Sequence, residues 1–339
     1  MTQKIKNINL NPGPYLKEDI TLSYMMKWTG VALLFPALGS IYYFGFRAFW
    51  LILVCLSTAV ITEIFCKFLT GRNMKNELGS AVVTGLILSL ILPADFPFWA
   101  AAVGAVFSIV VVKYIFGGTG KNIFNPALMA RAFLTAAFPI LITTYGVAPR
   151  PLFITDSNTS KVGAVTGATP LTEFKFEDNN PERVKIIAGE KIDGNNFLRY
   201  FLGSKRGSSG ETSALLILIG LAVLVVKKVI DWRLPVSYFS TVIALSTIIW
   251  LIRPDKFLDP LSTLLLGGVL LGGTYMITDP VTTPVTGKGK WVFGIGTGLL
   301  TLIIRNFSGY PEGVMFSILL MNAVTPLINR FTRPRIYGT

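Results

Sequence analysis

Histidine is absent from the 339 residues of this chain, and charged residues make up only 14% of it. A soluble globular protein usually carries about 25% charged residues, so the low share points away from the cytosol. Without histidine, the chain lacks the usual axial ligand of haem, the usual nitrogen ligand of zinc and the base of a Ser-His-Asp triad. We therefore expect no metal site and no catalytic residues in this chain.

Cysteine is scarce as well, because the only two, Cys55 and Cys66, lie in one apolar segment. On a helix they would stand about 16 Å apart along the axis, which is too far for a disulfide. Two cysteines cannot hold an iron–sulfur cluster alone, so we expect both to be small packing residues. The chain also has no GxGxxG motif after a strand, so any nicotinamide chemistry would belong to a partner.

Apolar sequence is what the chain has in excess, at 52% of all residues. It comes in blocks of about 17–23 residues, the length that crosses a hydrocarbon core of about 30 Å. We expect an all-α integral membrane protein with about ten transmembrane helices. Their expected ranges are 26–46, 47–69, 78–93, 97–115, 123–142, 211–230, 234–252, 258–278, 291–307 and 312–331. The third block is short and ends at Pro93, which predicts a tilted or broken helix, or a locally thinned bilayer.

The 31 basic residues outnumber the 18 acidic ones, but they lie mostly between the apolar blocks. This distribution indicates membrane topology and not a nucleic-acid partner. With the N-terminus inside, 17 basic residues fall on the inner side and 4 in the short outer connections. Long segments are translocated across the membrane largely regardless of their charge, so the nine basic residues of segment 143–210 do not alter the predicted orientation. Both termini are predicted to be cytoplasmic and segment 143–210 extracytoplasmic.

The chain also looks doubled, with five expected helices on each side of segment 143–210. Trp99–Phe116 and Trp291–Phe307 share length and layout, and the third helix of each half has glycine in its middle and a proline at its end. An odd number of helices per half predicts inverted repeats with the functional path at their interface. The alternative is that glycine-rich apolar stretches look alike by composition. The predicted parts are a cytoplasmic arm 1–25, a first repeat 26–142, the outer segment 143–210, a second repeat 211–331 and a cytoplasmic tail 332–339.

One motif with chemical potential is FGGTGKNIFNPAL, beginning at Phe116. Its glycines allow a tight turn, and Lys121 and Asn122 can donate hydrogen bonds. Asn125 and Pro126 begin a helix whose N-terminus would attract an anion. By itself, such a stretch is more often a plain cytoplasmic turn.

The second motif is VTGATPLT, residues 165–172 of the outer segment. The small Gly167 and Ala168 leave the hydroxyls of Thr166 and Thr169 accessible, and Pro170 holds the backbone extended. No histidine or lysine stands beside Thr169 to act as a base, so it is not a self-activated nucleophile. Taken alone, this pattern is a turn.

Three stretches occur in the order that is typical of the RnfD/NqrB family: GGTGKNIFNPAL, TGATPL and YMITDPVTTP. The chain resembles this family over roughly residues 77–305. The family comprises flavin-carrying membrane subunits of the Rnf complex and of the Na⁺-translocating NADH:quinone reductase. The resemblance implies ten helices in two inverted five-helix repeats, a urea-transporter-like fold. It also implies FMN joined through a phosphoester to Thr169 by a separate flavin transferase. One departure is Gly163, where the family pattern often has aspartate.

The short N-terminal arm favours RnfD, while the GGTGKN sequence favours NqrB. We expect the D-type and keep the NqrB-type as the alternative. The resemblance then implies an electron-transfer subunit of a redox-driven ion pump, an Rnf-type ferredoxin:NAD⁺ oxidoreductase, without a complete active site of its own. Its partners would be the C, G, A, E and B subunits in the plasma membrane. The coupling ion, Na⁺ or H⁺, the electron acceptor and a second, noncovalent flavin stay open.

Two rival functions are a secondary transporter or channel with the same inverted repeats, and a scaffold that carries no electrons. Ionisable groups near the membrane are costly and suggest function, which makes Glu63, Glu77 and Asp279 candidates for an ion path. Glu63 has Lys67 four residues later as a structural partner. Glu77 and Asp279 stand at corresponding ends of the repeated helices, where a cap or turn role is equally compatible.

Overall fold

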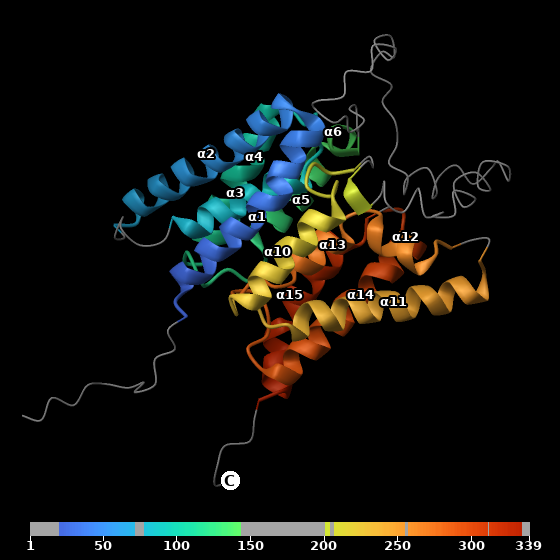
Figure 1. The fold of residues 1–339 in the computed structure, drawn as a ribbon. Helices are drawn as coiled ribbons and strands as arrows, with labels where there is room; N and C mark the ends of the chain where they lie inside the picture. The colour runs from blue at the N-terminus through green and yellow to red at the C-terminus, as the bar shows by residue number, and fades with distance from the viewer. Residues whose placement is uncertain are drawn as a thin grey trace, which may run out of the picture.

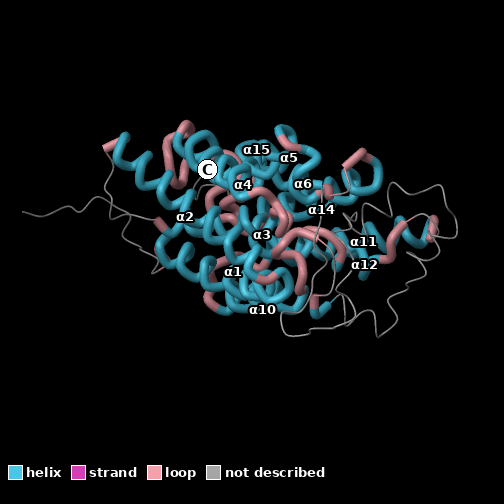
Figure 2. The backbone as a smooth tube through the Cα atoms, turned by 90° about the horizontal axis from the view of Figure 1, so that it is seen from above, coloured by secondary structure: helices cyan, strands magenta, loops and turns pink. Residues whose placement is uncertain are grey.

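The structure, a computed structural model, describes residues 20–71, 78–143, 201–203, 207–254, 257–310 and 312–333. Over these ranges the chain is helical and contains no β-strand. Figure 1 shows the helices of the first half, in blue and green, beside those of the second half, in yellow to red. Figure 2 shows the same bundle from above. Each of the ten expected segments is helical over most of its length, which confirms the all-α prediction.

The first half contains one short helix and one divided helix. Its elements are α1 (Leu22–Phe44), α2 (Phe46–Leu69), α3 (Gly79–Ile91), α4 (Phe98–Ile109) with the π-helical continuation η1 (Val110–Tyr114), α5 (Pro126–Ala137) and α6 (Pro139–Thr143). The 13 residues of α3 span about 20 Å, less than a hydrocarbon core of about 30 Å. Pro139 has no N–H to continue the helical hydrogen bonds, so the fifth expected helix divides at Phe138.

The second half contains an interrupted helix. Its elements are α10 (Ala214–Val226), α11 (Arg233–Ile252), α12 (Pro260–Leu265), α13 (Val269–Leu271), the π-helical η2 (Gly272–Met276), α14 (Gly287–Phe307) and α15 (Val314–Phe331). The expected helix 258–278 is therefore interrupted once, between α12 and α13, and α13 continues directly into η2. Its break lies at Leu266, which is extended, and at Gly267, whose φ of 71° is readily adopted only by glycine.

The outer surface of the bundle is rich in exposed apolar side chains, such as Phe46, Ile61 and Phe331. Within the described residues, α2, α11 and α15 are long and apolar enough to cross a membrane, and the shorter α3, α4 with η1, α5 and α10 are apolar as well. An apolar outer face on helices whose backbone groups bond internally is what a bilayer requires. The chain is an integral membrane protein.

The two halves meet along helices that come from both. In the first half, α2 packs along α3 and α4, and in the second half α14 packs between α11 and α15. The junction is formed where α1 packs on α10 and where α5 meets α15. Across it, the Tyr275 hydroxyl donates a hydrogen bond to the Ala32 carbonyl at 2.9 Å. This junction is where inverted repeats would place a functional path.

Residues 207–213 form a buried strap over the C-terminal end of α3. The Ser209 N–H donates to the Leu92 carbonyl at 3.0 Å, and the Gly210 N–H donates to the Leu90 carbonyl at 2.8 Å. The last carbonyls of a helix have no intrahelical partner, and the strap supplies donors for two of them. The boundary expected at residue 210 falls inside this strap.

Candidate functional site

The structure brings only some of the predicted site residues together. Thr166, Gly167, Ala168 and Thr169 lie outside the described residues, as does Glu77. Lys121 is exposed on the surface. Asn122, Asn125 and Asp279 line one pocket, and Glu63 lies in a separate buried cluster connected to it.

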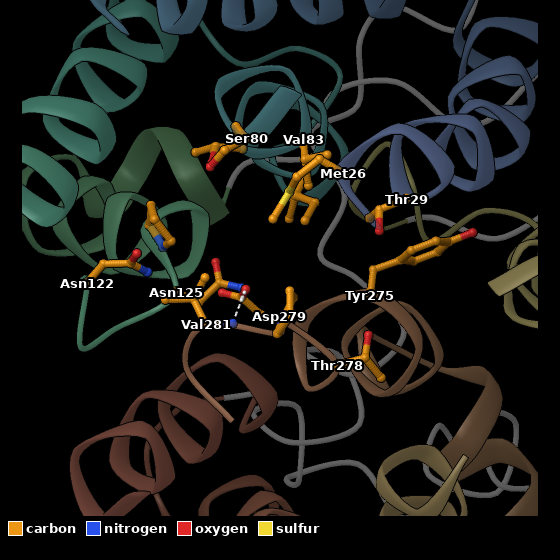
Figure 3. Close-up of a pocket in the computed structure, with 14 residues that line it drawn as sticks. Met26, Thr29, Ser80, Val83, Asn122, Asn125, Tyr275, Thr278, Asp279 and Val281 are labelled. Carbon is orange, nitrogen blue, oxygen red and sulfur yellow. Dashed lines mark hydrogen bonds between the residues drawn. The ribbon is translucent and has the colours of Figure 1, made fainter. Parts of the chain in front are cut away.

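The pocket lies at the junction of the two halves (Figure 3). From the first half it is lined by Met26, Thr29, Ser80, Val83, Thr84, Ile87, Asn122, Asn125 and Pro126, and from the second by Tyr275, Thr278, Asp279, Pro280 and Val281. Its volume of about 40 Å³ has room for a few water molecules. The donors and acceptors suit a small polar occupant, whereas a flavin ring does not fit this conformation.

The two asparagines hold the shape of the pocket wall. Asn125 caps α5, because its side-chain oxygen accepts from the N–H groups of Ala127 at 3.1 Å and Leu128 at 3.3 Å. The Asn122 amide donates to the Phe124 carbonyl at 3.0 Å, which fixes the turn before α5. The predicted helix start at Asn125 and Pro126 is confirmed. Both side chains have structural roles and also contribute to the lining.

Asp279 enters the pocket from the turn that follows η2. Its carboxylate accepts from the Val281 N–H at 3.2 Å and from the Thr282 hydroxyl at 3.3 Å. Within the described residues it forms no ion pair. The N-terminal ends of α3 and α5, at Ser80 and Asn125, line the same pocket, and their partial positive charge favours an anionic group there. A carboxylate with this environment can accept a cation without first giving up a salt bridge.

Glu63 is fully buried in the first half and is paired with lysine. Its carboxylate lies 2.8 Å from the Lys113 ammonium and 4.0 Å from that of Lys67, and it accepts from the Tyr114 hydroxyl at 3.1 Å. Lys113 also donates to the Ser80 hydroxyl at 3.2 Å. Because Ser80 lines the pocket, a hydrogen-bonded chain connects Glu63 to it.

Sequence reasoning identifies Lys67 as a partner of Glu63 but misses Lys113 and Tyr114. Charge counting assigns Lys113 to the inner side of the membrane, and the structure places its side chain in the interior of the bundle, where it is only 1% exposed. Lys67 is buried as well. The signal is the position of Lys113 inside the continuous apolar run SIVVVKYIF, where a surface loop would carry more polar residues.

Arg305 occupies the matching position in the second half. It follows Trp291 by fourteen residues, as Lys113 follows Trp99. Charge counting places Arg305 in an outer connection, but it is only 4% exposed and lies at the end of α14. Its guanidinium donates to the Thr263 carbonyl at 2.8 Å and to the Leu266 carbonyl at 3.0 Å. These carbonyls lie where α12 ends, so Arg305 stabilises the break in the interrupted helix.

Comparison with known proteins identifies the family of this sequence. The sequence model of the NQR2, RnfD, RnfE family matches residues 9–338. The D subunit of the proton-translocating ferredoxin:NAD(+) oxidoreductase complex of Clostridium ljungdahlii is 38% identical over 338 residues, 98% of this chain and 97% of that protein. The D subunit of the Na(+)-translocating ferredoxin:NAD(+) oxidoreductase complex of Acetobacterium woodii is 39% identical over 335 residues, covering 98% and 96%.

A third relative, the D subunit of the ion-translocating oxidoreductase complex of Stutzerimonas stutzeri, is 39% identical over 322 residues, 91% of this chain and 90% of that protein. All three names designate the D component of their complex, in agreement with the D-type expectation. With a family match over nearly the whole length and relatives above 30% identity, the chain belongs to the NQR2, RnfD, RnfE family, on its RnfD side.

Proposed function

We propose that this chain is the D-type electron-transfer subunit of an ion-translocating ferredoxin:NAD⁺ oxidoreductase complex. The observation that carries the proposal is the identity of 38–39% over nearly the full length to two subunits with that name. One of them is named for protons and the other for sodium ions at almost the same identity. The proposal therefore covers either ion, and each has to be measured.

The flavin site of the proposal is Thr169. Its support is the VTGATPL stretch, in which small neighbours leave the hydroxyl open to a modifying enzyme. A flavin transferase would join the Thr169 oxygen to the FMN phosphate from FAD, with AMP leaving as the pyrophosphate bond breaks. Attached FMN would supply the electron chemistry. Thr169 would contribute a fixed tether, which removes the entropic cost of keeping the cofactor in place.

The proposed topology is ten transmembrane helices in two inverted repeats, with both termini inside. The matching positions of Lys113 and Arg305 support it, since each buried cation contacts the beginning of the third helix of its own half. A reporter enzyme active only outside the membrane, fused after Ser204, should be active, while the same fusion at the C-terminus should be silent. The reverse result would overturn the orientation.

The ion path of the proposal passes through the pocket at the junction. The pocket has both polar and apolar side chains in its lining, has room for water and contains Asp279, a carboxylate without an ion pair among the described residues. The Glu63–Lys113–Ser80 chain ends at the same pocket, and we assign it the structural role of fixing the wall. Glu77 stays a candidate for the path on its sequence position alone.

The experiment that tests the flavin site is peptide mass spectrometry on protein purified from its own host. The peptide with Thr169 should carry an FMN-phosphoryl mass, and Thr169→Ala should abolish in-gel flavin fluorescence while Thr166→Ala retains at least part of it. Loss of electron transfer in an assembled Thr169→Ala complex would exclude the scaffold alternative. An unmodified Thr169 would refute the site, and a chain without flavin would favour the transporter or channel.

A further inference from the structure

A second cavity, of about 590 Å³, opens where α10 ends and where α11 and α14 begin. Its lining combines the α10–α11 loop, residues 228–234, with the turn at Thr278 and Pro280 and with Lys290 of α14. Thr278 and Pro280 also line the pocket of Asp279. Both cavities therefore border the turn that carries the Asp279 carboxylate.

The charge in this cavity is predominantly positive. Lys228, Arg233 and Lys290 line it together with a single acidic residue, Asp231. Asp231 lies 2.9 Å from the Lys290 ammonium and 3.8 Å from the Arg233 guanidinium. Lys228 makes no ion pair within the described part of the chain. One carboxylate thus orients two of the three cations, and the cavity keeps an excess of positive charge that suits an anion.

The backbone at Lys228 points to a role for its side chain. Lys228 has a φ of 54°, in the left-handed region, and its N–H donates to the Val225 carbonyl at 3.0 Å. Glycine is the residue that makes such a turn at the end of a helix without steric cost. A lysine here strains the turn, and what it adds is a cation at the edge of the cavity.

The rim of the cavity is apolar and aromatic. Trp232 and Val285 both line it and are exposed, and Trp232 packs edge-to-face with Trp291, their ring centroids 6.2 Å apart. Tryptophan is enriched where a transmembrane helix meets the headgroups of a bilayer. The basic groups inside the cavity suit the headgroup of a phospholipid, and the apolar groups at its rim suit the acyl chains.

We propose that this cavity binds a phospholipid with an anionic headgroup. Its phosphate lies between Lys228 and Arg233, and its acyl chains follow the apolar surface beside Trp232 and Val285. Lys290, held by Asp231, contributes further positive charge behind the headgroup. Basic pockets between transmembrane helices recognise anionic headgroups in this way. The bound lipid braces the turn at Thr278 and Pro280, and with it the position of Asp279.

The test uses the full chain in its complex, with dioleoyl phosphatidylglycerol and dioleoyl phosphatidylcholine as probes in native mass spectrometry. The variant Lys228→Gln/Arg233→Gln is compared with Lys288→Gln/Arg330→Gln, which removes the same charge from exposed positions that do not line the cavity. Two basic groups near a bilayer surface together change binding by about 30-fold. We expect that loss for phosphatidylglycerol in the first variant only, with phosphatidylcholine unaffected by either.

Asp231→Asn should change lipid binding in the direction opposite to the Lys228→Gln/Arg233→Gln variant. Removing the one acidic group should strengthen phosphatidylglycerol binding several-fold, so the proposal stays testable even if the double variant fails to fold. Millimolar inorganic phosphate should not displace the lipid, and displacement would mean that the site takes free phosphate. Equal loss in the two double variants would overturn the proposal. So would loss of a partner subunit with unchanged lipid binding, which would assign the cavity to a protein.

Discussion

Two carboxylates near the junction of the halves, Glu63 and Asp279, differ in what surrounds them. Glu63 is fully buried and lies 2.8 Å from the Lys113 ammonium, with Lys67 and Tyr114 beside it. Asp279 is partly buried and accepts only from a backbone N–H and a hydroxyl within the described residues. A carboxylate that is already paired with a cation stabilises the structure, whereas a carboxylate without a paired cation is able to bind a transported ion. We therefore propose a stabilising role for Glu63 and a role in ion transfer for Asp279.

The largest expected effect on stability is from breaking the Glu63–Lys113 pair. Glu63→Gln leaves a buried ammonium without its closest counter-charge, which should cost about 3–5 kcal/mol of unfolding free energy. Thermal unfolding of the purified chain would measure it. Glu63→Gln/Lys113→Met removes both charges of the pair and should recover part of the loss, because Lys67 stays charged beside residue 63. A double variant as unstable as the single one would show that the pair is not what stabilises this region.

The matching cation of the second half should give the next largest effect. Arg305→Met leaves the Thr263 and Leu266 carbonyls without their donor. Loss of the two hydrogen bonds should lower the free energy of unfolding by about 2–4 kcal/mol. Arg253→Gln, at an exposed position, is the control and should change stability by no more than about 0.5 kcal/mol. If both variants unfold at the same temperature, the guanidinium does not stabilise the break in the interrupted helix.

A smaller effect is expected from Tyr114→Phe, which removes one hydrogen bond to the Glu63 carboxylate. The ring and its packing are kept, so the loss should be about 1–2 kcal/mol. The same substitution in the Glu63→Gln/Lys113→Met background should cost less, because the acceptor is no longer charged. Equal losses in both backgrounds would mean that Tyr114 acts through packing and not through the carboxylate.

The fold is largely predictable from the sequence because a bilayer imposes one dominant requirement. Blocks of about 20 apolar residues mark helices whatever their neighbours, and the expected positions agree with the structure to within a few residues for α2, α11 and α15. The Asn125 cap is predictable too, since an asparagine before a proline begins a helix by local chemistry alone.

Contacts between distant segments are not predictable in this way. Lys113 stands fifty residues from Glu63, and although the apolar run around Lys113 indicates that it is buried, nothing local identifies Glu63 as its partner. For the same reason charge counting puts Arg305 in an outer connection, although it binds carbonyls of α12. The break at Gly267 is visible in the sequence only as a glycine-rich stretch, because glycine permits a left-handed turn but does not require it.

The smallest expected effect on stability is from Asp279→Asn. An asparagine can still accept from the Val281 N–H, and no salt bridge within the described residues is broken, so the change should stay within about 1 kcal/mol. Thermal unfolding next to Glu63→Gln would check it. A loss as large as that of Glu63→Gln would erase the distinction between the two carboxylates.

The most direct test of the account is the number of ions transported per electron by the complex in proteoliposomes, measured for Na⁺ and H⁺. Asp279→Asn should keep electron flux and lose ion uptake, because the pocket then lacks its charged ligand. Glu63→Gln/Lys113→Met, which changes the neutralised carboxylate, should keep both. An unchanged ratio of ions to electrons in Asp279→Asn would contradict the account and remove Asp279 from the ion path.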